Sequence, residues 1–291
     1  MAKDRWTRQP VLVEGPLVAL GIALATVTVA APLGAQQLDR TRDRGPGIPV
    51  SMFGTYIEPG EIILYPFFEY YYDNDAEYSP QELGYGLDRD FRGEYRASEA
   101  LVFLGYGISD RLAFEFEVAV ISARQDKSHK DPTDMPERIE ESGLGDVEGQ
   151  LRYRWRRESE GGPGIFSYFE TVFPLQKDKV LIGTQGWEFK LGTGFERGFR
   201  FGTMTLRLSV AYDEAEKKGE IGEYALEYVR RLKPWLGLYL GMEGSEDELE
   251  IIADTQWSLA RNVILKLNSA FGATSKATGW APEVGLMFRF R

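Results

Sequence analysis

The amino-acid sequence predicts an all-β fold, a transmembrane antiparallel up-and-down β-barrel of about 12 strands. Three observations predict it. Apolar and polar side chains alternate through segments of about 10 residues, long and short connections take turns, and no apolar run after residue 61 is long enough for a membrane-spanning helix. The chain of 291 residues is 43% hydrophobic and 13% aromatic, which is too apolar for a disordered protein.

Period-two alternation marks each strand. In residues 112–120, for example, Leu112, Phe114 and Phe116 alternate with Ala113, Glu115 and Glu117. Such alternation is typical of strands with one apolar and one polar face. The twelve expected strands are 61–73, 93–107, 111–124, 145–157, 164–175, 186–197, 200–213, 219–231, 234–243, 247–258, 262–273 and 281–290.

The connections indicate which kind of barrel this is. Residues 74–92, 125–144 and 176–185 form long or polar connections, whereas residues 109–110 and 198–199 form tight turns. Outer-membrane barrels have short periplasmic turns and long external loops, and an even strand number puts both chain ends on the periplasmic side. A soluble β-sandwich or barrel is the alternative, because its strands would also alternate.

Tryptophans favour the membrane barrel. Trp155, Trp235 and Trp257 fall near the expected periplasmic ends of their strands, whereas Trp187 and Trp280 fall near the external ends. Two bands of tryptophan are typical of the two interfaces of a membrane.

The N-terminus is typical of a secretory signal. Lys3, Arg5 and Arg8 precede an apolar run over residues 17–31, which small residues follow. This run is shorter than the roughly 20 residues of a membrane-spanning helix. The expected organisation is a signal peptide at 1–35, a periplasmic N-terminal segment at 36–60 and an outer-membrane barrel at 61–291.

Charge and composition exclude several classes of function. The net charge of −11 offers no cationic surface for phosphate backbones, so we expect no nucleic-acid partner. The chain has no cysteine, and its single histidine, His129, falls in a polar connection. Thiolate chemistry is therefore excluded and a histidine-based hydrolase is disfavoured. We expect no enzyme activity, no cofactor and no metal.

A glycine-rich strand start lies at residues 142–154, where Gly143, Gly145 and Asp146 form a Gly-x-Gly-Asp pattern. The glycines permit a tight backbone and Asp146 can accept from nearby amides, so we interpret the pattern as structural. It resembles the strand start of the outer-membrane family of MetA-pathway phenol-degradation proteins. Residues 58–61 and 109–112 also resemble that family, and the likeness extends loosely from about residue 57 to the C-terminus. The chain departs from the usual barrel ending, because Arg291 follows the aromatic Phe290.

The resemblance implies a channel-like barrel of the transporter kind, which passes small organic or aromatic solutes. Because Phe290 is the penultimate residue, we also expect recognition by the barrel-assembly machinery, in a form other than the usual one.

If the apolar face meets lipid, the charged face encloses the interior. A charge facing lipid at mid-depth costs about 2–4 kcal/mol, so these side chains must face water or pair with one another. Acids outnumber bases among them. The expected pore-lining residues are Glu115, Glu117, Asp146, Glu148, Arg152, Arg154, Glu170, Glu188, Lys190, Arg207, Glu227, Glu250, Asp254, Lys266 and Arg289.

Strand number sets the expected width of the interior. Barrels of about 8 strands are filled by side chains and those of 16–18 leave open channels, so twelve should leave a narrow passage. The sequence therefore predicts an outer-membrane channel in a Gram-negative-type cell for passive uptake of small, apolar or aromatic solutes. Its acidic excess favours cations or neutral solutes over anions. The expected partners are the bilayer with its outer-leaflet lipid, the assembly machinery and a small-molecule solute.

Two alternatives stay open. The interior could be plugged by salt-bridge ladders, in a structural or adhesin-like barrel whose external loops bind a partner. The inward aromatics, which are Tyr65, Phe67, Tyr71, Phe166 and Tyr168, could line a contact strip for apolar solutes or could simply be core.

Overall fold

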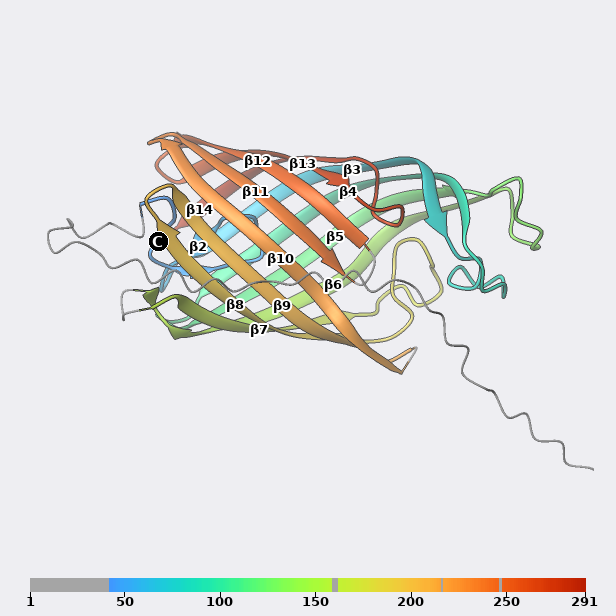
Figure 1. The fold of residues 1–291 in the computed structure, drawn as a ribbon, viewed down its shortest axis with the longest axis horizontal. Helices are drawn as coiled ribbons and strands as arrows, with labels where there is room; N and C mark the ends of the chain where they lie inside the picture. Colours follow the sequence, from blue (N-terminus) through green and yellow to red (C-terminus); the bar gives the residue numbers. More distant parts are fainter. Residues whose placement is uncertain (1–41, 159–161, 216, 246–247) are drawn as a thin grey trace, which may run out of the picture. The chain divides into compact units, whose positions relative to one another are not determined.

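A computed structural model of the chain describes residues 42–158, 162–215, 217–245 and 248–291. The predicted signal peptide lies outside the described residues. Within them the chain forms a closed barrel and one two-stranded sheet (Figure 1). The small sheet consists of β1 (Ile48–Pro49) and β2 (Tyr56–Ile57). The barrel strands are β3 (Ile62–Tyr78), β4 (Phe91–Gly107), β5 (Leu112–Asp126), β6 (Arg138–Arg156), β7 (Gly164–Phe173), β8 (Glu188–Phe199), β9 (Gly202–Asp213), β10 (Lys218–Lys233), β11 (Leu236–Ser245), β12 (Glu248–Ala260), β13 (Val263–Gly272) and β14 (Ala281–Phe290).

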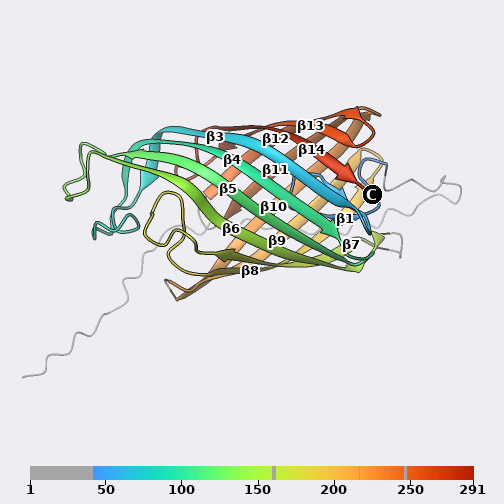
Figure 2. The same ribbon diagram turned by 180° about the vertical axis from the view of Figure 1, so that it is seen from behind.

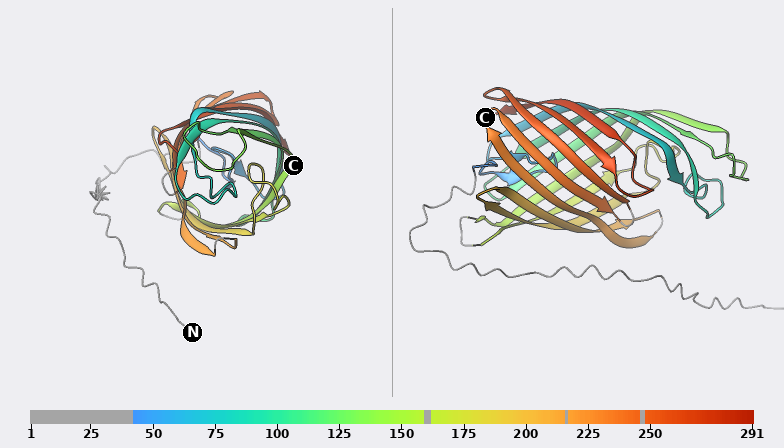
Figure 3. Two further views of the ribbon diagram at one scale, coloured as in Figure 1. Left: turned by 90° about the vertical axis from the view of Figure 1, so that its right-hand side faces the viewer. Right: turned by 45° about the horizontal axis from the view of Figure 1, so that its top comes forward.

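The described strands close in the simplest possible order. Each barrel strand pairs antiparallel with the next one along the chain, and β14 returns to pair with β3 (Figure 3). The predicted fold class is confirmed, including the number of barrel strands. Among the described residues, no helix is long and apolar enough to cross a membrane.

The strand bounds agree with the expected ranges to within a few residues, except that β3 ends five residues later and β6 begins seven residues earlier, at the end of the barrel where β3 to β6 lie side by side. There the strands extend beyond the others, as Figure 2 shows. We call this end of the barrel the mouth and the opposite end, which holds the C-terminus, the base. β6 begins at Arg138 rather than at the expected residue 145, because a bulge shifts the pairing between Val118 and Val120 and interrupts the alternation.

The outward face is apolar along most of the barrel wall. Val120, Leu191 and Val210 expose 58–59% of their surface although they lie in regular strands. Toward the mouth this face changes abruptly. Tyr70, Ser98, Ser122 and Ser142 are successive cross-strand neighbours, and the next row, two residues further, is Tyr72, Arg96, Arg124 and Glu140. An apolar band with polar borders is the surface expected of a transmembrane barrel.

Charged side chains on the extended strands pair with one another. Arg124 contacts Glu94 at 2.7 Å and Asp126 at 2.8 Å, and Arg138 contacts Asp126 at 2.7 Å. The hydrogen bond from Arg138 holds the pKa of Asp126 below its ordinary value. We infer from these paired charges that the extended ends of β3 to β6 lie in water rather than in lipid.

A charge within the apolar band is expected to be costly. Leu208 lies outward near the middle of β9, so Leu208→Arg should lower the free energy of unfolding by about 2–4 kcal/mol. Ile221→Arg, near the mouth end of β10, should cost no more than about 1 kcal/mol. Urea unfolding in lipid vesicles measures both. Equal, small effects would contradict lipid exposure of β9.

Candidate functional site in the barrel interior

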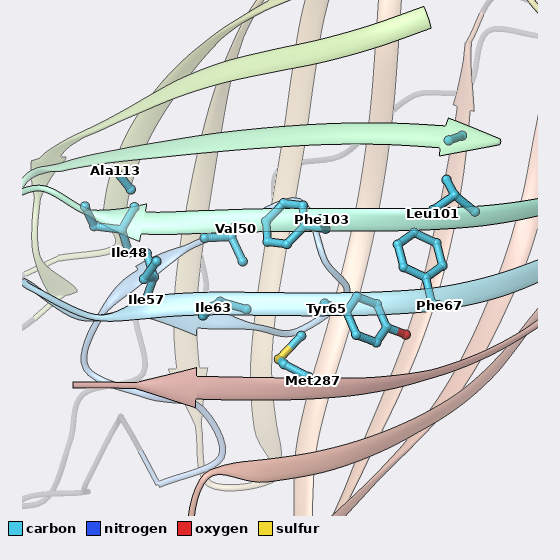
Figure 4. Close-up of a cluster of buried hydrophobic side chains, with 11 residues drawn as sticks. Ile48, Val50, Ile57, Ile63, Tyr65, Phe67, Leu101, Phe103, Ala113 and Met287 are labelled. Carbon is cyan, nitrogen blue, oxygen red and sulfur yellow. The ribbon is translucent and has the colours of Figure 1, made fainter. Parts of the chain in front are cut away.

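Residues 42–57 lie inside the barrel. Residues 36–60 were expected as a periplasmic segment ahead of the barrel, but described residues 42–57 contact inward-facing side chains at the base. Ile48, Val50 and Ile57 are at most 6% exposed and belong to one core cluster with side chains of the barrel wall (Figure 4). Burial of these apolar side chains explains why the segment folds back into the barrel. The wall residues of this cluster include Ile63, Tyr65, Phe67, Leu101, Phe103, Ala113 and Met287.

We call residues 48–57, which form β1, β2 and the connection between them, the hairpin. Arginine side chains hold its start. Arg154 donates to the carbonyl oxygen of Gly47 at 2.6 Å, and Arg152 donates to that of Pro49 at 3.3 Å. Arg152 also pairs with Glu115 at 2.6 Å, and both side chains are almost fully buried. Arg152 and Glu115 therefore neutralise each other inside the barrel.

The tip of the hairpin, residues 51–54, spans the lumen. On one side, Glu115 accepts from the backbone N and the Oγ of Ser51, at 2.9 and 2.5 Å. On the other, the carbonyl oxygen of Phe53 accepts from Gln256 at 2.8 Å and from Lys266 at 3.1 Å. The tip thus bridges β5 to β12 and β13.

Two neighbouring cavities lie between the tip and the mouth and share part of their lining. The central cavity, of about 220 Å³, has Met52 and Phe53 of the tip in its lining. The mouth cavity, of about 350 Å³, shares Glu117 and Glu148 with it. A third, smaller cavity of about 50 Å³ lies beyond the tip, toward the base, with Gly54 in its lining. The tip is therefore the barrier between the wide and the narrow part of the interior.

Each cationic side chain of the central cavity pairs with two or three carboxylates. Arg207 contacts Glu227 at 2.6 Å and Glu243 at 3.1 Å, and also pairs with Glu223. Lys190 contacts Glu223 at 3.2 Å and also pairs with Glu170. Two cations thus meet four carboxylates.

Glu117 and Glu148 differ from these residues. They are direct partners in the register of β5 and β6, yet neither has a hydrogen bond or ion pair among the described residues. Like charges directly opposite one another destabilise a sheet. Glu148 is exposed to the cavity, so water is the medium that solvates this pair. Two carboxyl groups without an ion pair therefore lie in the lining that the two cavities share.

All fifteen predicted lining residues lie on the inward side of the described barrel, in two groups, and their lining of an open pore stays a prediction. Those around the hairpin are Glu115, Arg152, Arg154, Asp254, Lys266 and Arg289. Those toward the mouth are Glu117, Asp146, Glu148, Glu170, Glu188, Lys190, Arg207, Glu227 and Glu250. The structure adds Glu69, Glu99 and Glu243, which the sequence analysis missed. Glu69 has the same parity as Tyr65 and Phe67, so the alternation could have revealed it.

The inward aromatics are core in large part. Tyr65 and Phe67 stack at 4.7 Å beneath the hairpin, and the Phe166 and Tyr168 rings flank the Arg152 guanidinium at 5.7 and 5.1 Å. Tyr71 is half-buried and packs against two smaller clusters. Of the two readings left open, packing fits these five residues better than an open contact strip.

The connection between β7 and β8 folds into the mouth and is held by Asp146. This side chain accepts from the backbone N of Leu175 at 2.7 Å and from the Oγ1 of Thr184 at 2.8 Å. Ile182, only 4% exposed, packs against Ala97 and Ala123 on the inward face. Asp146 accepts from amides, as its structural interpretation expects, but these amides belong to the connection between β7 and β8, and the pattern lies within β6 rather than at a strand start, because β6 already begins at Arg138.

Asp146→Ala should release this connection. Removal of the carboxylate leaves the amides of residues 175–184 without their acceptor, so the segment should open more often. Trypsin cleavage after Lys177 and Lys179 of the membrane-inserted protein should then become several-fold faster. Glu188→Ala, which removes another carboxylate from the lining of the mouth cavity and leaves the cleavage sites unchanged, is the matched control. Identical cleavage rates in the two variants would show that Asp146 does not hold the connection.

No protein-family model matches the chain, and no curated protein matches it. Among solved structures, it is similar to an outer-membrane channel from Pseudomonas putida F1, with 13% identity and a TM-score of 0.59 over 83% of this chain and 99% of that chain. It is also similar to the translocator domain of the autotransporter NalP from Neisseria meningitidis, with 9% identity and a TM-score of 0.50 over 80% and 90%. At these identities the likeness is one of fold, and the resemblance to the MetA-pathway family stays a prediction. The chain has the closed-barrel fold of these outer-membrane proteins.

Proposed function

We propose that the protein is an outer-membrane channel through which small cationic or neutral solutes diffuse. The mouth faces the outside of the cell and the base faces the periplasm, since long connections lie outside and short turns inside in such barrels. The apolar band around the wall supports insertion in a bilayer. The charge and the size of the interior determine the class of solute that we propose.

One observation carries the proposal: Glu117 and Glu148 lie, without partners, where the two wide cavities meet. Rings of acidic side chains favour cations in a pore, because they replace part of the hydration that a cation loses on entry. Arg207 and Lys190 do not oppose this, since carboxylates already neutralise them. Anions are therefore repelled at the junction.

Size limits the solute as well. The central cavity of about 220 Å³ accommodates a molecule of only a few carbon atoms together with water. Met52, Phe53 and Phe103 form apolar lining there, so a small organic cation can contact carboxylates and rings at once. Uptake of purely apolar or aromatic solutes is a weaker expectation, since most inward aromatics are covered by the hairpin or by Arg152.

Planar-bilayer recording tests the proposal. Refolded protein should give a small, stepwise conductance, and under a potassium chloride gradient its reversal potential should have the sign of cation selectivity. Anion selectivity would contradict the proposed solute class.

A plugged barrel is the second candidate, and the hairpin favours it, because residues 48–57 fill much of the base. In that case the external strands and loops bind a partner, and the protein carries no current at any voltage. Absence of conductance in the wild type and in every variant described below would support this candidate over the channel.

A further inference from the structure

The hairpin has a fixed part and a loosely held part. Ile48, Val50, Tyr56 and Ile57 are at most 6% exposed, whereas residues 51–54 are all partly exposed. The fixed part is anchored by apolar packing and by arginine donors on its carbonyl groups. The tip projects from this anchor into the lumen.

Met52 and Phe53 pack at the edges of two buried clusters, and the other contacts of the tip are mostly polar. Apart from the two contacts of Ser51 with Glu115, its main attachment is the Phe53 carbonyl on Gln256 and Lys266. The Phe53 ring lies 5.3 Å from the Tyr239 ring, in a tilted arrangement. Because residues 51–54 are all partly exposed, the tip buries a smaller share of its surface than the anchored part and can detach at lower cost.

The backbone of the tip permits this movement. Gly54 has a φ of +63°, in the left-handed region that glycine adopts without a steric penalty. It lies between Phe53 and Thr55, next to the anchored strand β2. A rotation there would swing Phe53 away from β11 and β12 without moving Tyr56.

We propose that residues 51–54 are the gate of this channel, and that the gate opens by detachment of the Phe53 carbonyl and ring while the rest of the hairpin stays in place. Opening joins the central cavity to the small cavity at the base, so that solutes cross beside the hairpin rather than through the space it fills. The inference rests on the proposed channel function. It assigns to the tip a role that the barrel wall does not have.

A disulfide that can be formed and reduced tests whether holding the tip against the barrel wall stops the current. We call this disulfide the lock. The chain has no cysteine, so an introduced pair has no competing thiol. A Cβ atom placed on Gly54 would lie 3.0 Å from Cγ2 of Val229, which puts the two Cβ atoms within about 4.5 Å, in the range of a disulfide. In Gly54→Cys/Val229→Cys, oxidation should abolish most of the current and reduction should restore it. The two single-cysteine variants should not respond to oxidant.

An unlatched variant tests the open direction. Phe53→Ala/Gln256→Ala removes the ring and one donor, and should raise the mean conductance at least about twofold with the hairpin still anchored. Phe91→Ala/Gln125→Ala makes the same two changes near the mouth and should leave the conductance at its wild-type value. Protection of the hairpin from protease in both variants shows that the anchor is intact.

The outcomes separate the gate from the channel. Equal, cation-selective currents in wild-type, locked and unlatched protein would overturn the gate and leave the channel standing. No current from any of them, reduced or oxidised, would overturn both. Current that responds to the lock and to the unlatching supports the gate.

Discussion

Replacing Arg152 with methionine is expected to destabilise the barrel by about 3–5 kcal/mol, the cost of leaving a buried carboxylate without its partner. Arg152 is 1% exposed and pairs with Glu115 at 2.6 Å. The same guanidinium donates to Pro49 of the hairpin and lies between two aromatic rings. Its loss therefore affects the charge balance, the wall and the hairpin together.

Two measurements resolve these contributions. Urea unfolding in lipid vesicles, followed by tryptophan fluorescence, gives the stability change. Glu115→Gln in the Arg152→Met background removes the unpaired charge and should restore a substantial part of the lost stability, since replacing both partners of a buried pair is far less costly than replacing one. A double variant no more stable than Arg152→Met would assign the loss to packing rather than to charge.

Replacing Glu117 and Glu148 together with glutamine should produce the largest change in selectivity. The substitutions keep side-chain size while removing two negative charges from the junction of the wide cavities. The preference for potassium over chloride should fall by at least about threefold, and the conductance should stay within about twofold of wild type. The reversal potential under a salt gradient measures this directly.

The matched control makes the same two glutamate-to-glutamine substitutions at positions outside the lumen. Glu94→Gln/Glu140→Gln removes two acids from the outward face of the extended strands, where both already pair with arginine. This variant should keep the wild-type selectivity. If it shifted selectivity as strongly as the junction variant, net charge of the protein rather than the lumen would set the preference.

Much of the barrel could be predicted because each strand has one face in an apolar environment and one in a polar environment. Because of that constraint, apolar and polar residues alternate along β5, β9 and β14. The same alternation places Glu115, Lys190 and Asp254 on the inward face without further information. Alternation fails where the backbone departs from a regular strand. The bulge at Gly145 and Asp146 reversed the parity ahead of it, so the first residues of β6 were assigned to a connection.

The hairpin could not be predicted by the same means. Its strands have two residues each, and its conformation depends on contacts with Arg152, Gln256 and Arg289, which are far away in the sequence. A short segment with glycines and prolines has no periodic pattern to interpret. The pairing of Arg207 with three glutamates from neighbouring strands could not be predicted either, because alternation defines the register between adjacent strands only approximately.

Solute flux into proteoliposomes tests the central claim, a cation-preferring passage through the acidic interior, most directly. Putrescine, 1,4-butanediol and succinate share a four-carbon chain and differ in charge, so their entry rates compare charge at nearly constant size. If the passage prefers cations, putrescine and butanediol should enter the vesicles, and succinate should enter most slowly of the three. Entry of succinate ahead of putrescine would contradict this preference.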